Sequence, residues 1–241
     1  MARIFITGSS DGLGQLAATK LVDLGHQVIL HARNAARAEH AMSVVPGAET
    51  ILIADLSDME ETKKLAKEVN DLGSFDAIIH NAGVYQASSS TIFSVNTLAP
   101  YILTCLIAKP KRLVYLSSGM HLGGDSGLRN LKSGRISYSD SKFHDLLLAK
   151  AVARKWPDVY SNAVDPGWVP TKMGGPGAPD NLQKGYETQV WLAVSDDAKI
   201  TGQYFFHQNR SRYLEAADST KLQEQFLEIC KQVTGVSFPM I

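Results

Sequence analysis

The decisive stretch of this sequence is Thr7-Gly8-Ser9-Ser10-Asp11-Gly12-Leu13-Gly14. It follows the apolar run Ile4–Ile6 and leads into a helix-like run that extends to Leu24. A strand, a glycine-rich turn and a helix in this order form an anion cradle, because the free N–H groups and the positive end of the helix dipole point at the turn. The glycine spacing is G-x-x-x-G-x-G rather than the better-known G-x-G-x-x-G of dinucleotide sites. By itself, the pattern also fits an ordinary tight turn between a strand and a helix.

Short apolar runs alternate with amphipathic runs along the chain, which is typical of a parallel sheet with helices on both faces. Strands are predicted over residues 2–7, 27–32, 49–53, 76–80, 111–117, 159–164 and 202–206. Helices are predicted over residues 12–24, 35–43, 58–71, 91–108, 138–155, 182–194 and 218–233. Segments 119–137 and 166–181 are rich in turn residues and are predicted to be loops beside the ligand crevice. The prediction is one α/β domain over residues 1–241, with a doubly wound, seven-stranded parallel sheet.

Charge and hydropathy exclude several classes of function. The 24 basic and 24 acidic residues give a formal net charge of +0, so the sequence predicts no nucleic-acid or anionic-membrane partner. The longest apolar run, Tyr101–Ala108, is far shorter than the roughly 20 residues of a membrane-spanning helix. The first predicted strand already contains residue 3, and the two separated cysteines fit buried thiols in a reducing compartment, which predicts a cytoplasmic protein. The seven histidines have no carboxylates at ligand spacing, so no metal site is predicted.

Tyr138 and Lys142 are the strongest candidates for chemistry. Their i, i+4 spacing at the start of a predicted helix places the phenol and the ammonium on one face. A free tyrosine has a pKa near 10, and a neighbouring lysine favours the phenolate and is expected to lower this pKa. Such a pair also occurs on ordinary helix surfaces. Ser117-Ser118 favours the catalytic interpretation, because it ends a predicted strand where active-site groups should lie.

These motifs together resemble the short-chain dehydrogenase/reductase family. Besides the glycine turn and the Tyr138–Lys142 pair, the resemblance includes three further motifs in the family's order: Asp55-Leu56, Asn81-Ala82-Gly83 and Asp165-Pro166-Gly167-Trp168-Val169-Pro170-Thr171. It covers residues 2 to about 206. Tyr204-Phe205 and the tail Leu227–Gly235 look most like the retinol-dehydrogenase and WW-domain-oxidoreductase branch and its bacterial relatives.

The resemblance implies a Rossmann fold, a nicotinamide cofactor and specific residue roles. Tyr138 would be the general acid or base, and Lys142 would lower its pKa and hold the nicotinamide ribose. Ser118 would polarise the substrate oxygen, and Asn96 would position Lys142 through a water. The implied catalytic set is Asn96, Ser118, Tyr138 and Lys142. The implied cofactor-binding set is Gly8, Ser9, Ser10, Asp11, Gly12, Leu13, Gly14, Arg33, Asp55, Leu56, Asn81, Ala82, Gly83, Tyr138, Lys142, Pro166, Gly167, Val169 and Thr171.

The sequence departs from the family pattern in two places. The interval from Asn81 to Asn96 is short, so the helix that carries Asn96 must be cut short or begin late. The interval from Ser118 to Tyr138 is long, and its extra residues, His121–Arg135, are expected to cover the substrate side. His121 is expected to be an exposed loop residue.

The second predicted strand indicates which nicotinamide is bound. Ala32 stands where NAD-binding proteins carry an acidic residue for the ribose, and Arg33 follows it. A guanidinium suits a 2′-phosphate, so the sequence predicts NADP(H), with NAD(H) as the alternative because Asp11 places an anion nearby.

The predicted activity is reduction of an aldehyde or ketone, or oxidation of an alcohol. The alternatives are a catalytically silent NADP(H)-binding regulator and, less favoured by the glycine spacing, a nucleotide-sugar epimerase. Family members often form homodimers or homotetramers through the helix that carries the tyrosine, here Tyr138.

Overall fold

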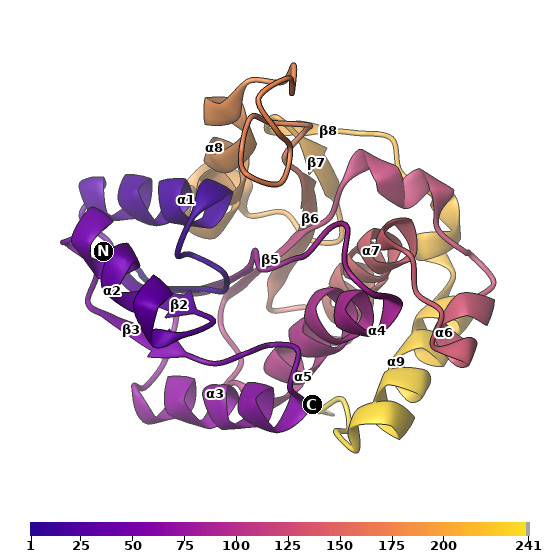
Figure 1. The fold of residues 1–241 in the computed structure, drawn as a ribbon. Helices are drawn as coiled ribbons and strands as arrows, with labels where there is room; N and C mark the ends of the chain where they lie inside the picture. Colours follow the sequence, from indigo (N-terminus) through magenta and orange to yellow (C-terminus); the bar gives the residue numbers. More distant parts are fainter. Residues whose placement is uncertain (240–241) are drawn as a thin grey trace.

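In a computed structural model, which describes residues 1–239, the chain forms one sheet between two layers of helices (Figure 1). The strands are β1 (Arg3–Ile6), β2 (Gln27–Ala32), β3 (Thr50–Ile53), β4 (Ala77–His80), β5 (Arg112–Leu116), β6 (Tyr160–Asp165), β7 (Tyr204–Phe206) and β8 (Asn209–Arg210). Their order in the sheet is β3-β2-β1-β4-β5-β6-β7-β8. Each neighbouring pair is parallel except β7 and β8. The predicted α/β Rossmann fold is therefore confirmed.

The helices match the predicted runs closely. They are α1 (Gly12–Asp23), α2 (Ala35–Val44), α3 (Met59–Asp71), α4 (Ser89–Ile92), α5 (Ala99–Leu106), α6 (Arg129–Ser133), α7 (Tyr138–Lys155), α8 (Leu182–Val194) and α9 (Thr220–Thr234). A π-helix, η1 (Phe93–Leu98), joins α4 to α5, and three 3₁₀ turns are η2 (Gly119–Gly123), η3 (Asp196–Ala198) and η4 (Glu215–Asp218). Within residues 1–239, no helix is both long and apolar enough to cross a membrane.

Both faces of the sheet are apolar, because successive side chains of a strand point to opposite faces. Ile4 and Ile6 of β1 pack into the core under α1 and α8, whereas Phe5 packs into the core under α3, α5 and α7. All three side chains are 0% exposed. Figure 1 shows α1 and α8 on one side of the sheet and α3, α5 and α7 on the other. The strands therefore read as continuous apolar runs rather than as an alternating pattern.

The sheet contains one topological switch point. From β1 the chain continues outward to β2 and β3, and then returns to place β4 on the other side of β1. The loops that leave the carboxyl ends of β1 and β4 run in opposite directions at this point. A crevice therefore opens between the turn after β1 and the turn after β4. The glycine-rich turn and Asn81 flank this crevice.

The sheet has eight strands rather than the predicted seven. β8 pairs antiparallel with β7 across the two-residue turn His207-Gln208, whose φ angles are 49° and 64°. Such hairpin turns usually contain Gly, Asn or Asp, because only these residues adopt positive φ easily. The sequence signal for a hairpin was therefore missing.

The helical segment that carries Asn96 begins two residues earlier than predicted. The predicted helix over 91–108 begins instead at Ser89 and includes the six-residue π-helix before it ends at Leu106. Segment 119–137 is also more regular than a loop, since it holds η2 and α6. Asp125 accepts hydrogen bonds from the N–H groups of Gly127, Arg129 and Asn130 and so fixes the start of α6.

The helix that carries Tyr138 is covered within the chain. Residues 140–152 of α7 are all buried. Part of this cover is α9: His144 stacks on Phe226 with ring centroids 5.4 Å apart, and Arg154 donates to Gln223 at 2.8 Å. α9 therefore covers part of α7 within the chain.

Candidate active site

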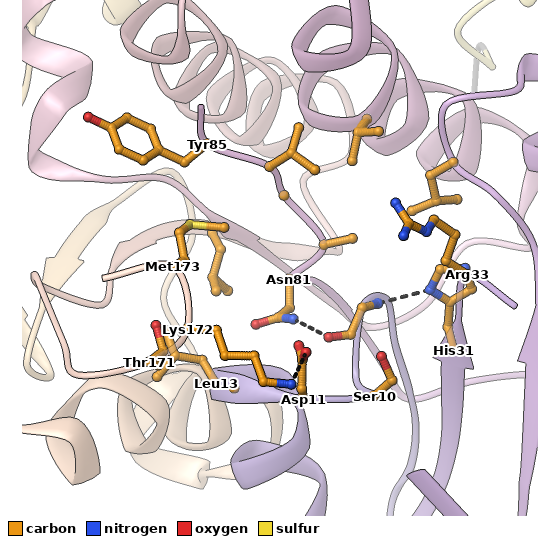
Figure 2. Close-up of a pocket in the computed structure, with 18 of the residues that line it drawn as sticks. Ser10, Asp11, Leu13, His31, Arg33, Asn81, Tyr85, Thr171, Lys172 and Met173 are labelled. Carbon is orange, nitrogen blue, oxygen red and sulfur yellow. Dashed lines mark hydrogen bonds and ion pairs between the residues drawn. The ribbon is translucent and has the colours of Figure 1, made fainter. Parts of the chain in front are cut away.

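One cavity of about 630 Å³ lies over the carboxyl ends of the central strands and joins most of the predicted site. In Figure 2, Arg33 and His31 lie on one side of the cavity, and Thr171, Lys172 and Met173 lie on the other. The predicted residues that line it are Gly8, Ser10, Asp11, Gly12, Leu13, Arg33, Asp55, Leu56, Asn81, Ala82, Gly83, Tyr138, Lys142, Pro166 and Thr171. Six predicted residues, Ser9, Gly14, Asn96, Ser118, Gly167 and Val169, are not among the lining residues.

The three glycines of the first turn are subject to different steric and backbone constraints. Gly8 has φ +62°, and a Cβ there would lie 2.8 Å from the Ala82 Cα. Gly12 has φ +56°, and a Cβ there would meet only Thr171, in ordinary van der Waals contact at 3.9 Å. A Cβ on Gly14 would lie 2.3 Å from the Asn81 Nδ2. Gly8 and Gly14 therefore let the turn and α1 approach the loop after β4, while Gly12 leaves the N-terminus of α1 open to an anion.

Ser9 and His31 fasten this turn to β2. The Ser9 hydroxyl donates to the Ile6 carbonyl at 2.9 Å and accepts from the His31 N–H at 2.8 Å. His31 Nδ1 accepts from the Gly8 N–H at 2.9 Å, and its Nε2 donates to the Ala54 carbonyl at 3.0 Å. Burial lowers the pKa of His31 to about 4, so the ring is neutral near pH 7. Ser9, predicted to touch the cofactor, is fully buried and does not line the cavity.

Two cations that the sequence analysis missed meet Asp11. Its Oδ2 lies 3.0 Å from the Arg37 Nη1 and 3.4 Å from the Lys172 Nζ (Figure 2 shows the second contact). Arg37 lies in the first turn of α2, four residues after Arg33, and this second arginine is a signal that the sequence did contain. The negative charge of Asp11 is thus matched by two positive side chains at the rim of the cavity.

Asp55 and Leu56 line the same end of the cavity as Arg33. Burial opposes ionisation of Asp55, but hydrogen bonds from Ser57 and the charge of Arg33 hold its pKa below the ordinary value. Asp55 accepts from the Ser57 N–H at 2.9 Å and from the Ser57 hydroxyl at 2.7 Å. The carboxylate is therefore an anion with fixed orientation beside the Arg33 guanidinium.

Tyr138 is the first residue of α7, and its position is set by the helix cap. Ser137 and Asp140 form a capping box, in which each side chain accepts from the other residue's backbone N–H. The Tyr85 ring stands edge-on to the Tyr138 ring with centroids 4.8 Å apart. Burial raises the pKa of Tyr138 above its ordinary value, and this effect outweighs the opposite influence of Lys142. Lys142 thus acts on this pKa in the expected direction, but burial leaves the pKa raised overall.

Lys142 is held by two internal acceptors. Its Nζ donates to the Leu116 carbonyl at 2.7 Å and to the Asp145 Oδ2 at 2.9 Å, and it lies 5.5 Å from the centre of the Tyr138 ring. Burial disfavours the ammonium, but the Asp145 carboxylate raises the pKa of Lys142 above its usual value. Asp145 was not singled out from the sequence.

Asn96 lies behind the cavity wall. It belongs to the π-helix η1 and is fully buried. Its Oδ1 accepts from the Val84 N–H at 2.8 Å, and its Nδ2 donates to the Val84 carbonyl at 2.9 Å and to the Ser141 hydroxyl at 3.0 Å. A Cβ on Gly83 would lie 3.4 Å from the Lys142 Nζ and 3.6 Å from the Asn96 Oδ1, so both groups border the same glycine.

At the end of β5 the cavity wall is Ser117 rather than Ser118. The Ser117 hydroxyl donates to the Lys142 carbonyl at 2.7 Å. Ser118 caps η2, and its Oγ accepts from the Met120 N–H at 3.2 Å. His121 is 0% exposed, contrary to expectation: its Nδ1 donates to the Ser118 carbonyl at 2.6 Å and its Nε2 accepts from the Leu214 N–H at 3.2 Å.

The loop after β6 contributes Pro166, Thr171, Lys172 and Met173 to the cavity. Gly167 and Val169 have structural roles within the loop. Gly167 has φ +82°, and a Cβ there would lie 2.8 Å from the Asp180 Oδ2. Asp180 also accepts from the Trp168 N–H at 2.6 Å, so this carboxylate ties the two ends of the loop together. Val169 is buried.

Comparison with known proteins defines the class. A family model described as short chain dehydrogenase matches residues 2–181. The chain therefore belongs to the short-chain dehydrogenase/reductase family of nucleotide-binding oxidoreductases, as its motifs predict. It is 48% identical over 254 aligned positions to an uncharacterized oxidoreductase of Emericella nidulans, and the match covers 99% of both chains.

Two further similarities bear on the branch and the fold. Retinol dehydrogenase 14 of Mus musculus is 25% identical, over 97% of this chain and 86% of that protein, in agreement with the predicted branch. The structure of a blue fluorescent protein from a metagenomic library, in complex with NADPH, shares the fold with a TM-score of 0.72 and 19% identity, over 85% of this chain and 95% of that one.

Proposed function

We propose that this protein is a nicotinamide-dependent reductase that converts the carbonyl group of a small molecule to an alcohol, with NADP(H) preferred to NAD(H). One observation carries the proposal: a single cavity joins the glycine-rich turn, the Arg33 guanidinium and the Tyr138–Lys142 pair. The three features are those that bind a pyrophosphate, bind a 2′-phosphate and transfer a proton.

The lining residues fit a dinucleotide along the cavity. Gly12 and Leu13 would receive the pyrophosphate at the start of α1, and Arg33 would meet the 2′-phosphate. Asp55 and Leu56 would frame the adenine, and Asn81, Ala82 and Gly83 would line the adenosine side. Lys142 would hold the nicotinamide ribose, and Thr171 would meet the carboxamide. When bound, the nicotinamide would supply the hydride. The NADPH in the structurally similar blue fluorescent protein supports this choice of cofactor class.

Tyr138 would supply the proton. Because burial raises its pKa, the phenol keeps its proton at neutral pH and can donate it to the oxygen of a reacting carbonyl. Ser118, which follows Ser117 of the cavity wall, would assist: its oxygen accepts from the Met120 N–H, which leaves its own O–H proton free to hold an oxygen of a substrate that extends beyond the cavity. The half-exposed side chains of Tyr85 and Met173 at the cavity favour a substrate with an apolar body. Buried, free Cys105 and Cys230 support a cytoplasmic enzyme.

The first prediction tests the chemistry at Tyr138. Tyr138→Phe removes only the hydroxyl, so NADPH binding is expected to change by less than about twofold, while kcat falls by about 10²–10⁴, the usual contribution of a general acid. NADPH oxidation with a panel of apolar aldehydes and ketones measures kcat, and NADPH fluorescence measures binding. Tyr160→Phe, on β6, is the matched control and should keep wild-type turnover.

Two outcomes would count against the proposal. Retention of more than about a tenth of wild-type kcat in Tyr138→Phe would remove this residue from the general-acid role. A wild-type protein that binds NADPH but reduces no member of the panel would favour the silent regulator.

A further inference from the structure

A buried carboxylate extends the Tyr138–Lys142 pair into a row of three polar groups. Asp145 follows Lys142 by three residues, so positions 138, 142 and 145 lie on one face of α7. The side chains of Lys142 and Asp145 are only 5% and 4% exposed, and the Nζ and Oδ2 atoms are 2.9 Å apart. The mechanism proposed above assigns no role to this carboxylate.

Stability does not explain why an ion pair is buried here. Removing two charges from water costs several kcal/mol per ion, and apolar replacements of buried pairs are often neutral or stabilising. Most of the other buried side chains of α7 are apolar, including Phe143, Leu146 and Leu147, which are all 0% exposed. A charged residue beside the active-site lysine therefore suggests an electrostatic role in the site.

The surroundings indicate what this charge acts on. Asp145 faces Lys142 and Tyr138 of its own helix and Tyr115 of β5. Tyr138 in turn faces Lys142, Asp145, the Asp165 carboxylate at the end of β6, and Tyr85. Lys142 is the only cation in this group, and it favours the phenolate. The two carboxylates oppose it, so Asp145 acts against the influence that Lys142 has on the phenol.

We propose that Asp145 is a positioning residue, which holds the Lys142 ammonium against the Leu116 carbonyl and offsets its charge, so that Tyr138 stays a proton donor. The inference rests on the proposed function, and it goes further by giving the site a direction: a tyrosine that keeps its proton suits carbonyl reduction better than alcohol oxidation. Two acceptors at 2.7 and 2.9 Å also fix where the ammonium stands.

The test is a titration of Tyr138 that needs no turnover. Asp145→Asn keeps the shape of the side chain and removes its charge. The tyrosinate absorbance of each protein, minus that of the same protein carrying Tyr138→Phe, isolates Tyr138 from the other seven tyrosines. The pKa of Tyr138 should fall by about one unit in Asp145→Asn, the lower end of the effect of a nearby like charge. An unchanged or higher value would overturn the inference, including the case in which Lys142 loses its proton instead.

Asp218→Asn is the matched control. Asp218 of η4 accepts from Lys150 at 2.6 Å, and Lys150 lies on α7 but away from Tyr138. Removing the Asp218 carboxylate should therefore leave the tyrosinate titration unchanged. A merely structural role for Asp145 would lower the stability of Asp145→Asn without moving this titration. Asp145→Glu, which restores the charge, should return the titration toward the wild-type value.

A second measurement uses the wild-type side chain and so does not depend on whether Asp145→Asn folds. Burial raises the pKa of Asp145 to about 6. The ring ¹³C signal of Tyr138, assigned with Tyr138→Phe, should therefore show a step near pH 6, and its absence would contradict the coupling. If both titrations succeed and no carbonyl compound is reduced, the proposed function fails while the coupling stands.

Discussion

At the end of the cavity next to β2, two guanidinium groups have different partners. Arg37 forms an ion pair with Asp11 at 3.0 Å, whereas Arg33 has no ion pair within residues 1–239 and lines the cavity. A phosphate that reaches this end would compete with Asp11 for Arg37 but would find Arg33 available. The residue that should distinguish NADPH from NADH is therefore Arg33.

Arg33→Ala should weaken NADPH binding by about tenfold to a hundredfold, the range expected when a charge-assisted contact of about 1.5–3 kcal/mol is lost. The Kd for NADH, which lacks the 2′-phosphate, should change by less than about twofold by the same reasoning. Both values are measured by fluorescence titration at one fixed salt concentration, because salt screens exposed pairs. Arg212→Ala, an exposed arginine outside the cavity, is the control. An equal loss for both cofactors would mean that Arg33 supports the loop rather than the phosphate.

At the scale of elements, the close approach of α1 to the loop after β4 shapes the cradle. Gly14 makes this approach possible, and the Asn81 Nδ2 fills the space that a side chain would take, donating to the carbonyls of Thr7 and Gly8 at 3.0 Å each. The turn, the helix and the loop are thus held as one unit, and the phosphate cradle depends on their spacing.

Gly14→Ala should separate these elements. Its Cβ would lie 2.3 Å from the Asn81 Nδ2 and 2.6 Å from the Gly8 carbonyl oxygen, so the unfolding free energy should drop by about 1–3 kcal/mol, the usual cost of overpacking. NADPH affinity should fall as well, because the cradle widens. Urea unfolding and NADPH titration measure the two effects. Gly177→Ala, where a Cβ meets nothing within 4 Å, should change neither. A Gly14→Ala protein of wild-type stability would show that α1 can shift at little cost.

Local patterns explain what the sequence analysis could predict. The alternation of elements, the glycine turn and the Tyr138–Lys142 spacing involve residues close together in the chain, and the fold reproduces them. The partners of His31, the buried position of His121 and the cap at Ser118 depend on contacts between distant segments, such as His121 with Leu214. A local pattern contains no signal for these contacts. The sequence predicts only an ordinary helix at Asn96, where the structure has a π-helix.

At the scale of the whole molecule, three histidines that burial keeps neutral contact aromatic residues of the core under α3, α5 and α7. Burial lowers the pKa of His31 and of His144 to about 4, and that of His80 to about 3. His144 also shares a hydrogen bond of 3.1 Å with the Thr97 hydroxyl. In the unfolded chain each of these side chains takes up a proton near pH 6.5. Acid should therefore act on the fold as a unit rather than on the cavity alone.

The unfolding free energy should be steady above about pH 7 and should fall as the pH drops from about 6.5 to 4, because in this window the unfolded state binds protons that the folded state cannot. Between pH 6.5 and 4 each histidine can contribute up to about 3.4 kcal/mol, because this window spans about 2.5 pH units at about 1.36 kcal/mol each. Asp145 opposes this trend, since its raised pKa of about 6 makes the folded state take up a proton below that pH. Three histidines against one carboxylate leave a net loss of stability in acid.

Urea unfolding followed by tryptophan fluorescence across this range measures the slope. His144→Gln should be less stable at pH 7 but should have a shallower slope, whereas replacing the exposed His40 by Gln should alter neither. An unchanged slope in His144→Gln would show that this histidine is not what couples the fold to acid.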